Sequence, residues 1–510
     1  MIPAVSAYQG KPILFVDGKP TLLFAGEVHN SSASSLSYME EQVWPHVRDL
    51  HLNSLVVPVS WEFLEPTPGE YDFTLPDGMI EQARREGVKL VFLWFGLWKN
   101  GVSTYVPAWM KQDRDTYFLM RTRDGQAVDA ISPLCQAGVD RDAAAFRALL
   151  GHLRDTDTDH TVVMVQVENE MGLLGDCRDF GPEAERAYAA EIPEEMASLY
   201  QVSGTWVQAF GEDAPERFMV YFYAKAVEQI AAAGKAEYSL PLYVNAWLEQ
   251  YPWTPGTYPC GGPVAKMIDQ WTALAPSIDL YAPDIYVTDF ASVCKAYAIN
   301  GNPLFIPEAR PSMDSASNVF AAFGEFGALG FSPFAIEGVG QNQRSALPAG
   351  LMEELNIVPE AFDHYRAGEY LGESYALLRS IADLLVEYRL TLALQGFTRC
   401  ERESGTLLSF EQYNLEIKYL PHRGESPKAG GLVLQLSRDE FLLCGMNYSV
   451  KPLVKKDDTG WVDIVSITEG RYENGEWVPG RRLNGDEFHC QLGAHPQMLK
   501  LVLSHRSRSV

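Results

Sequence analysis

Short apolar runs alternate with amphipathic stretches from the N-terminus to about residue 390, and this rhythm limits the fold more than any other feature. The runs are rich in β-branched and aromatic residues and are apolar on both faces, as parallel strands covered by helices must be. Eight of these runs are predicted strands: Phe24–Val28, Ser54–Val59, Lys89–Phe95, Val162–Val167, Leu242–Trp247, Asp279–Tyr286, Leu304–Pro307 and Gly330–Ile336.

A stretch with helical spacing of its apolar residues follows each of these runs. The predicted helices are Ser37–Leu50, Pro76–Glu86, Asp140–Asp155, Pro215–Ala233, Val264–Ala273, Phe290–Ile299, Ala316–Phe326 and Glu369–Tyr388. Eight strand–helix pairs predict an α/β fold of the (β/α)8 TIM-barrel type. A doubly wound open sheet is the alternative, but no Gly-x-Gly-x-x-Gly follows an early strand.

Two further regions flank this repeating pattern. Before it, the runs 13–16 and 21–24 surround Asp17-Gly18, which predicts an N-terminal hairpin. Beyond Gly396, short alternating runs are separated by turn residues without a helical period, which is typical of a small β-sandwich. A chain of 510 residues is expected to hold more than one domain. We therefore predict a catalytic barrel with its hairpin at residues 1–395 and a β-sandwich domain at 396–510.

Charge and composition limit the partners. The net charge is −26, from 67 acidic and 41 basic residues, so nucleic acid and anionic membranes are unfavourable partners and a small neutral ligand fits best. Seven scattered cysteines without a Cys-x-x-Cys spacing predict neither a zinc site nor a disulfide framework. No basic n-region and no apolar run of 18 residues is present, so a cytoplasmic enzyme is the default expectation, with a homo-oligomer left open.

Two of the predicted strands run into acidic residues at their carboxyl ends. The fourth ends in Glu168-Asn169-Glu170 and the seventh in Glu308-Ala309-Arg310. Catalytic groups of a (β/α)8 barrel gather at this end of the strands. Two carboxylates facing each other at about 5–5.5 Å suit a retaining glycoside hydrolase. We therefore predict Glu170 as the general acid/base and Glu308 as the nucleophile.

Neighbouring residues refine this assignment. A single Glu at a strand end is more often a helix cap or a solvated rim residue, so the hypothesis depends on the pair. Glu168 is the rival for the acid, and we expect it to point away from the face of Glu170 or into the barrel wall. Asn169 is a candidate for binding a sugar hydroxyl, and Arg310 could help to keep Glu308 ionised.

At this point the chain resembles glycoside hydrolase family 35, whose members are mostly β-galactosidases. The segments Gly26–His29 and Trp61–Phe73 resemble the opening of that family, and Gln166–Gly172 resembles the strand whose Glu after Asn is the acid/base. Phe305–Glu308 is similar to the nucleophile strand of the wider clan A. The resemblance covers roughly residues 10–390, and the tail is similar to a β-domain in β-galactosidase-like bacterial members.

One departure concerns the sugar. The family's Cys-Ala-Glu-Trp motif after the third strand, whose Glu holds galactose hydroxyls, is replaced here by the segment Leu93–Gly101. Galactose specificity is therefore an open question, whereas the mechanism is unaffected. Asn100 is a candidate for replacing a polar contact, and a turn role beside Gly101 is the alternative.

Four further residues at the strand ends are candidate substrate contacts with structural alternatives. Clan members often place a tyrosine that bonds the nucleophile where Tyr286 stands, although it could equally be a packed core residue. Glu337 could bind hydroxyls or pair with a cation. His29 could contact a ligand or form the wall, and Trp247 could lie under the sugar or belong to the core.

The sequence thus predicts a retaining, exo-acting β-glycosidase, with β-galactosidase as the first choice. It would act on a small neutral glycoside or oligosaccharide by double displacement, without a metal or an organic cofactor. A retaining hydrolase of another sugar, such as a β-glucosidase or an α-L-arabinopyranosidase, is the alternative among enzymes. A non-catalytic carbohydrate-binding protein is the alternative from another class, but such a protein needs no carboxylate on both sides of one bond.

Overall fold

A parallel eight-stranded sheet dominates the computed structural model, which describes residues 1–299, 301–341, 362–422, 424–456 and 458–506. Its strand order is β4-β13-β12-β11-β10-β9-β6-β5, so neighbours in space are mostly neighbours in sequence. The strands are β4 (Leu23–Phe24), β5 (Ser54–Ser60), β6 (Lys89–Lys99), β9 (Val162–Asn169), β10 (Leu242–Trp247), β11 (Leu280–Ile285), β12 (Ile306–Ala309) and β13 (Gly330–Pro333).

Backbone hydrogen bonds between the first and second strands close this sheet. The amide of Val56 in β5 donates to the carbonyl oxygen of Gly26 at 2.8 Å, and the amide of Val28 donates to the carbonyl oxygen of Val56 at 3.2 Å. The two ends of the strand order therefore meet. The predicted (β/α)8 barrel is confirmed, and the open doubly wound sheet is excluded.

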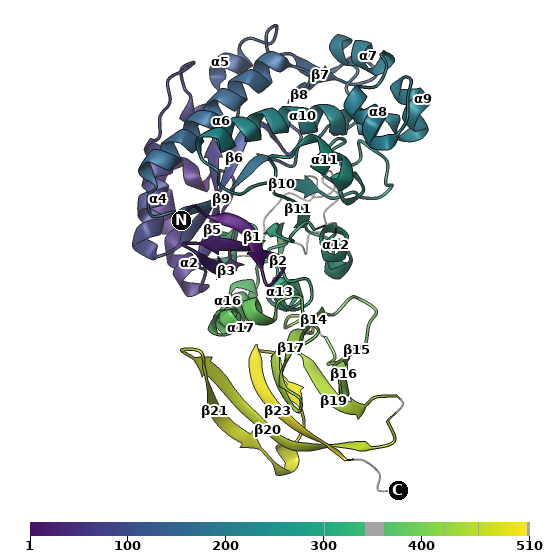
Figure 1. The fold of residues 1–510 in the computed structure, drawn as a ribbon. Coiled ribbons are helices and arrows are strands. Elements are labelled where there is room, and N and C mark those ends of the chain that lie inside the picture. Colours follow the sequence, from purple (N-terminus) through teal and green to yellow (C-terminus); the bar gives the residue numbers. More distant parts are fainter. Residues whose placement is uncertain (300, 342–361, 423, 457, 507–510) are drawn as a thin grey trace.

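Helices surround the barrel as the sequence pattern predicts (Figure 1). They are α2 (Trp44–Asp49), α4 (Thr74–Glu86), α6 (Gln136–Thr156), α10 (Ala214–Glu237), α11 (Ile268–Leu274), α12 (Phe290–Tyr297), α13 (Ser315–Gly324), α16 (Ala367–Ser380) and α17 (Ala382–Tyr388). The first predicted helix is interrupted by a π-helical turn at Met39–Val43, and the last is divided in two at Ile381.

The N-terminal hairpin differs in extent from the prediction. It forms between β2 (Lys11–Val16) and β3 (Lys19–Thr21), and β1 (Ala4–Tyr8) adds a third strand. Leu23 and Phe24 are not part of it, because these buried side chains pair with β13 in the barrel. The long loops after β6 and β9 also contain elements that we did not predict: β7 (Leu119–Arg121), β8 (Ala127–Ile131), α7 (Pro182–Ala189), α8 (Glu194–Tyr200) and α9 (Trp206–Phe210).

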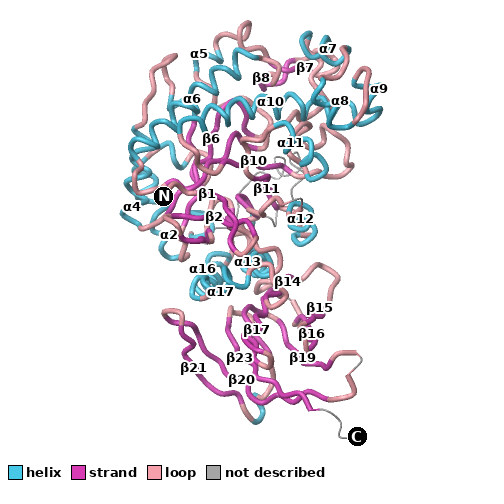
Figure 2. Tube along the Cα trace, viewed as in Figure 1, coloured by secondary structure: helices cyan, strands magenta, loops and turns pink. Residues whose placement is uncertain are grey.

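Beyond α17 the chain forms two antiparallel sheets, seen as the magenta strands below the barrel in Figure 2. Side chains of both sheets, including Leu415, Ile417, Val433 and Leu443, form one apolar core between them. The six-stranded sheet has β14 (Leu394–Thr398), β17 (Gly430–Ser437), β18 (Glu440–Met446), β23 (Gln497–Arg506), β20 (Trp461–Glu473) and β21 (Glu476–Leu483). The four-stranded sheet has β15 (Gly405–Ser409), β16 (Tyr413–Tyr419), β19 (Tyr448–Val454) and β22 (Gln491–Leu492).

The outer face of the six-stranded sheet packs against the barrel helices. Leu432 and Met446 belong to the same apolar core as the barrel. A Cβ atom added at Gly324 of α13 would lie 2.8 Å from Cβ of Leu432 and 3.1 Å from Cα of Gly396, so the helix and the sheet touch closely. One apolar core thus extends from the barrel into the six-stranded sheet. The domain boundary between residues 395 and 396 stays a prediction.

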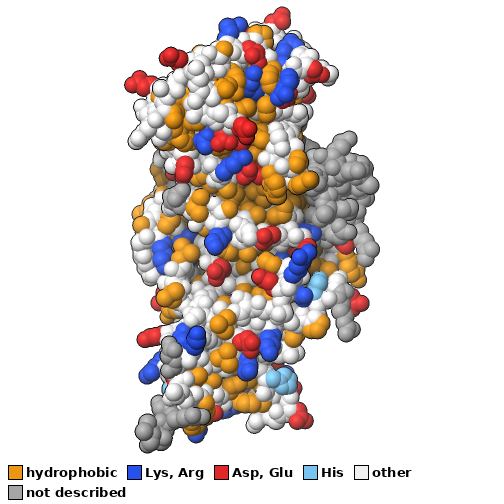
Figure 3. All heavy atoms as spheres, turned by 90° about the vertical axis from the view of Figure 1, so that its right-hand side faces the viewer, with side chains coloured by type: hydrophobic (Ala, Val, Ile, Leu, Met, Phe, Trp, Pro, Cys, Tyr) orange, Lys and Arg blue, Asp and Glu red, His pale blue; other side chains and the backbone are white. Residues whose placement is uncertain are grey.

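The surface charges, the cysteines and the apolar character of the helices complete the description of the fold. Acidic and basic side chains are interspersed over the face shown in Figure 3. All seven cysteines are free thiols. Among the helices that the structure describes, none has the length and apolar character needed to cross a membrane.

Candidate active site

Three buried carboxyl groups meet at the carboxyl ends of the barrel strands. They belong to Glu170, directly after β9, to Asp284 in β11 and to Glu308 in β12. One carboxylate oxygen of each lies within 4.8 Å of the other two. The residues are 5%, 2% and 6% exposed, so water screens their charges weakly.

An asparagine holds two of these groups together. The side-chain oxygen of Asn245 in β10 accepts a hydrogen bond of 2.8 Å from the backbone amide of Glu170. Its side-chain nitrogen donates to Oδ2 of Asp284 at 2.6 Å. Burial and the charge of Glu308 raise the pKa of Glu170 to about 7, against an opposing influence of Lys99. Burial and the same charge also raise the pKa of Asp284 well above its usual range.

Glu308 has a different partner. Its Oε1 accepts a hydrogen bond from the hydroxyl of Tyr286, which follows β11, and its Oε2 is buried with no hydrogen-bond partner among the described residues. Burial and the charge of Glu308 raise the pKa of Tyr286 well above its usual value, so the phenol stays a proton donor. One oxygen of Glu308 is therefore held by Tyr286, and the other has no hydrogen-bond partner in the described part of the chain.

Asn169 and Asn100 lie beside a buried lysine. Nζ of Lys99, the last residue of β6, donates a hydrogen bond of 2.8 Å to Oδ1 of Asn169 and lies 5.1 Å from the ring centroid of Phe95. The amide of Asn100 donates to the carbonyl oxygen of Asn169 at 3.2 Å, at a φ of 52°. Nδ2 of Asn169 and Oδ1 of Asn100 are buried without a partner in the described part of the chain, so both amides have capacity for a ligand.

His29 and Glu337 pair with each other. Nδ1 of His29 lies 3.0 Å from Oε1 of Glu337, which also accepts from the backbone amide of His29 at 3.2 Å and from the hydroxyl of Ser32 at 2.5 Å. Burial alone would raise the pKa of Glu337, but the hydrogen bond and charge of His29 bring it below its usual range. Trp247 ends β10 and is half-buried, in register with Asp284 of the next strand.

Four polar residues at this site were not predicted as candidates: Glu27, Lys99, Asn245 and Asp284. Glu27 is 1% exposed, its Oε1 has no partner among the described residues, and burial and Glu308 raise its pKa well above the usual range. Asn245 and Asp284 interrupt apolar strands, Lys99 ends one, and Glu27 follows the apolar run of β4 and forms an isolated bridge with Val56. That interruption is a signal that the sequence contains, because a polar residue inside a buried strand needs a partner.

Glu168 is not part of the cluster of three carboxyl groups and bonds to the backbone of β6 instead. Its Oε2 accepts a hydrogen bond of 2.6 Å from the backbone amide of Trp98, and its Oε1 accepts one of 3.2 Å from that of Leu97. Asp142 of α6 accepts from the amide of Leu97 as well, at 2.8 Å. A Cβ atom at Gly96 would come within 2.5 Å of Glu168 and 2.4 Å of Asp142, so only glycine fits here. Glu168 thus connects the barrel to a covering helix.

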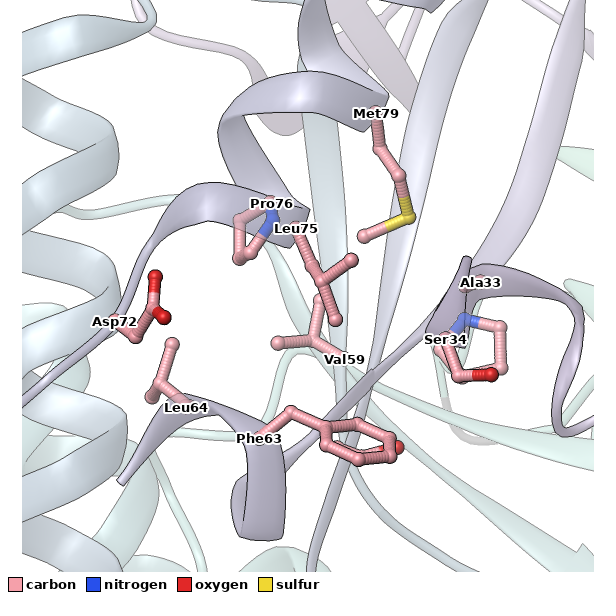
Figure 4. Close-up of a pocket in the computed structure, with 11 residues that line it drawn as sticks. Ala33, Ser34, Val59, Phe63, Leu64, Asp72, Leu75, Pro76 and Met79 are labelled. Atoms are coloured by element: carbon pink, nitrogen blue, oxygen red, sulfur yellow. The ribbon is translucent and has the colours of Figure 1, made fainter. Parts of the chain in front are cut away.

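Two other features are separate from this site. Figure 4 shows a small pocket lined by Val59, Phe63, Leu75 and Met79, with a volume of about 10 Å³. That is room for one water molecule and too little for a sugar. Glu369, Glu373 and His495 form an exposed cluster with the spacing of a cation site, but exposed acidic groups are common without a bound cation. The three buried carboxyl groups of the site have a similar spacing.

Comparison with protein families defines the class of this protein. Residues 13–247 match the model described as Glycosyl hydrolases family 35, and residues 371–494 match a domain of unknown function, DUF5597. The chain is thus built on a (β/α)8 barrel whose first part is similar to the glycoside hydrolases of family 35, as its motifs indicated. The match extends over the first five barrel strands. Glu170 lies inside the matched range, whereas Asp284 and Glu308 lie beyond it.

Comparison with solved structures shows the fold. The β-galactosidase from Bacillus circulans sp. alkalophilus aligns with a TM-score of 0.54 at 10% identity, over 94% of this chain and 99% of that chain. The β-galactosidase from the psychrophilic Marinomonas ef1 aligns with a TM-score of 0.47 at 12% identity, over 71% of this chain. The β-galactosidase from Rahnella sp. R3 has a TM-score of 0.48 at 15% identity, over 72% of this chain. The alignments span only 61% and 57% of the latter two proteins. No curated protein sequence matches the chain.

Proposed function

We propose that the chain is a retaining, exo-acting β-glycosidase that hydrolyses terminal β-galactosides by double displacement. The observation that carries this proposal is the pair of buried carboxylates, Glu170 and Glu308, on two nonadjacent strands with oxygens within 4.8 Å. One sugar–oxygen bond fits between two such groups, and a purely binding protein has no need of both. The exo mode and the preference for galactose rest on the family resemblance.

Glu170 acts as the general acid/base. At a pKa of about 7, its carboxyl group holds a proton in neutral and mildly acidic solution and can give it up within the reaction. In the first step it protonates the glycosidic oxygen, and the leaving alcohol departs. When Glu308 is esterified its negative charge is lost, so the influence that raised the pKa of Glu170 diminishes. Glu170 then serves as the base for the second step.

Glu308 acts as the nucleophile. Its free oxygen attacks the anomeric carbon while the other oxygen keeps the hydrogen bond from Tyr286. A glycosyl ester forms as the bond to the leaving oxygen breaks. A water molecule, deprotonated by Glu170, then attacks the same carbon, releases Glu308 as a carboxylate and gives a sugar of retained configuration.

Asn169, Asn100, Glu27 and Lys99 are the proposed contacts for sugar hydroxyls. Lys99 lies at the end of β6, near the place where the family's galactose-binding Glu would follow the strand. A lysine can only donate hydrogen bonds, so the acceptor for a sugar hydroxyl must come from another residue. We assign that acceptor role to Glu27. Tyr286, His29, Trp247 and Glu337 complete the proposed substrate contacts. The family's galactose-binding Glu is missing from this segment, so a glycoside of another sugar, such as a β-glucoside or an α-L-arabinopyranoside, is the second candidate substrate.

Azide rescue tests the two roles. Glu308→Ala should abolish turnover, and azide should restore it with a glycosyl azide of inverted configuration. Glu170→Ala should slow poor leaving groups by about 10²–10⁴-fold, and azide should rescue an activated aryl galactoside with retained configuration. Retained products from both rescues would contradict the assignment. Hydrolysis of a glucoside or an arabinoside, but not a galactoside, would correct the sugar and leave the mechanism.

A further inference from the structure

Two large aromatic side chains are left in solvent on the loop that follows β10. Tyr251 is 76% exposed and Trp253 is 62% exposed. Aromatic rings usually bury most of their surface, because their removal from water is strongly favourable. The other exposed tryptophan of the described chain, Trp461, is 46% exposed and lies in β20, far along the chain. The pair therefore needs a different explanation from packing.

Hydrogen bonds within the loop fix its shape. The backbone amide of Trp253 donates to the carbonyl oxygen of Gln250 at 2.7 Å. The side-chain nitrogen of Gln250 donates to the carbonyl oxygen of Thr257 at 2.8 Å, and the hydroxyl of Thr257 donates to the carbonyl oxygen of Thr254 at 2.7 Å. The two rings are thus displayed by an internally bonded loop.

This loop is joined to the segment that follows Glu170. Leu173 and Cys260 exchange two backbone hydrogen bonds of 2.9 Å each. The amide of Gly175 donates to the carbonyl oxygen of Gly256, also at 2.9 Å. The loop that carries the rings and the loop that leaves the acid/base therefore form one unit.

Glycines make this close contact between the loops feasible. A Cβ atom at Gly256 would lie 2.6 Å from the carbonyl carbon of Asp176, and one at Gly172 would lie 2.5 Å from the carbonyl carbon of Pro259. Both glycines also have positive φ values, 97° and 141°. Side chains would force the two backbones apart, so the sequence on both sides preserves the contact.

The chemistry of the reaction indicates which part of a substrate this loop would contact. In a retaining glycosidase the acid/base contacts the oxygen of the leaving group, so structure attached to its loop borders the leaving-group side. The carbon–hydrogen faces of sugar rings are apolar and their edges are polar, which suits flat aromatic side chains beside polar groups. Thr254, the exposed residue next to Trp253 in the sequence, supplies such a polar group.

We propose that Tyr251 and Trp253 form an aromatic platform that binds a sugar ring on the leaving-group side of the scissile bond. This inference rests on the proposed function, and it deepens it by assigning oligosaccharides, rather than simple alkyl or aryl glycosides, as the substrate class.

Substrates with and without a second sugar test the platform. The parent enzyme, Trp253→Ala and Tyr251→Ala would be assayed on a β-linked galactobiose and on methyl β-galactoside. The ratio of kcat/KM for galactobiose to that for the methyl galactoside should fall about three- to tenfold in each variant. Trp461→Ala is the matched control and should leave both rates and their ratio unchanged. An unaltered ratio in both platform variants would overturn the proposal.

Binding without turnover provides a second measurement. Calorimetric titration of galactobiose into Glu308→Gln should show a loss of affinity of the same size when Trp253→Ala is added. If the parent enzyme cleaves neither galactoside, the proposed function fails, and titration of a panel of oligosaccharides into the parent and Trp253→Ala still decides the platform. Equal affinities in that comparison would overturn it.

Discussion

The hydroxyl of Tyr286 donates a hydrogen bond to Oε1 of Glu308, across the adjacent strands β11 and β12. Hydrogen bonds to buried charged groups are worth about 1.5–3 kcal/mol. Tyr286→Phe removes this donor and keeps the ring, which packs on Phe362. We expect kcat to fall roughly 10–150-fold, because the carboxylate is less well stabilised when it leaves the sugar. A variant that folds normally but keeps the full rate would contradict this role.

The raised pKa of Glu170 predicts the alkaline limit of activity. With a pKa of about 7 in the folded enzyme, the acid form predominates below that pH and is lost above it. For an aryl galactoside with a poor leaving group, kcat/KM should therefore decrease about tenfold per pH unit once the pH exceeds about 7. The alkaline limb should disappear in Glu170→Gln assayed with an activated substrate. Persistence of the limb there would assign it to another group.

Asp284 is expected to position Glu170 through Asn245. Asp284→Ala deprives the side-chain nitrogen of Asn245 of its acceptor, and a buried unsatisfied donor costs about 1–3 kcal/mol. We expect both a lower free energy of unfolding and a lower kcat. Asp284→Asn keeps an acceptor oxygen of the same shape, so it should recover most of the stability in denaturant titrations. Equal losses in both variants would show that Asn245 does not depend on this contact.

Replacing Glu168 and replacing Glu170 should affect stability and azide rescue differently. Glu168 accepts hydrogen bonds from the backbone amides of Leu97 and Trp98, so Glu168→Ala should lower the free energy of unfolding by about 2–5 kcal/mol. Azide should not restore its activity, because no face of the sugar is vacated. Thermal unfolding and azide titration of Glu168→Ala and Glu170→Ala together separate the two. Rescue of Glu168→Ala by azide would reverse our choice of acid/base.

Gly96 offers a test of the same packing. Gly96→Ala would place a methyl group within 2.5 Å of the carboxylates of Glu168 and Asp142. We expect a loss of stability of about 1–3 kcal/mol from this overpacking, with the catalytic pair chemically intact. Gly125→Ala, at a glycine with open space around its Cβ position but a φ of 85°, shows the cost of backbone strain alone. A smaller loss at Gly96 than at Gly125 would contradict the proposed clash.

Local patterns were enough to predict the barrel. Strand β10 begins and ends where its apolar run does, and β5 and β9 extend only slightly beyond theirs, because buried parallel strands need apolar residues on both faces. The helices were predicted nearly as well. The hairpin was misjudged at Leu23–Phe24, where an apolar pair suits either a hairpin or a barrel strand and only its pairing with β13 decides.

The sequence by itself determined that Glu170 and Glu308 stand at strand ends, since an apolar run followed by a carboxylate is visible without coordinates. It did not determine that Asp284, Glu27 and Lys99 converge on that pair. These residues come from strands whose positions are set by closure of the barrel, through hydrogen bonds such as those between Val56 and Gly26. Only the tertiary structure decided their roles, because the pKa of a carboxyl group depends on burial and on charges that chain-distant strands bring within a few ångströms of it.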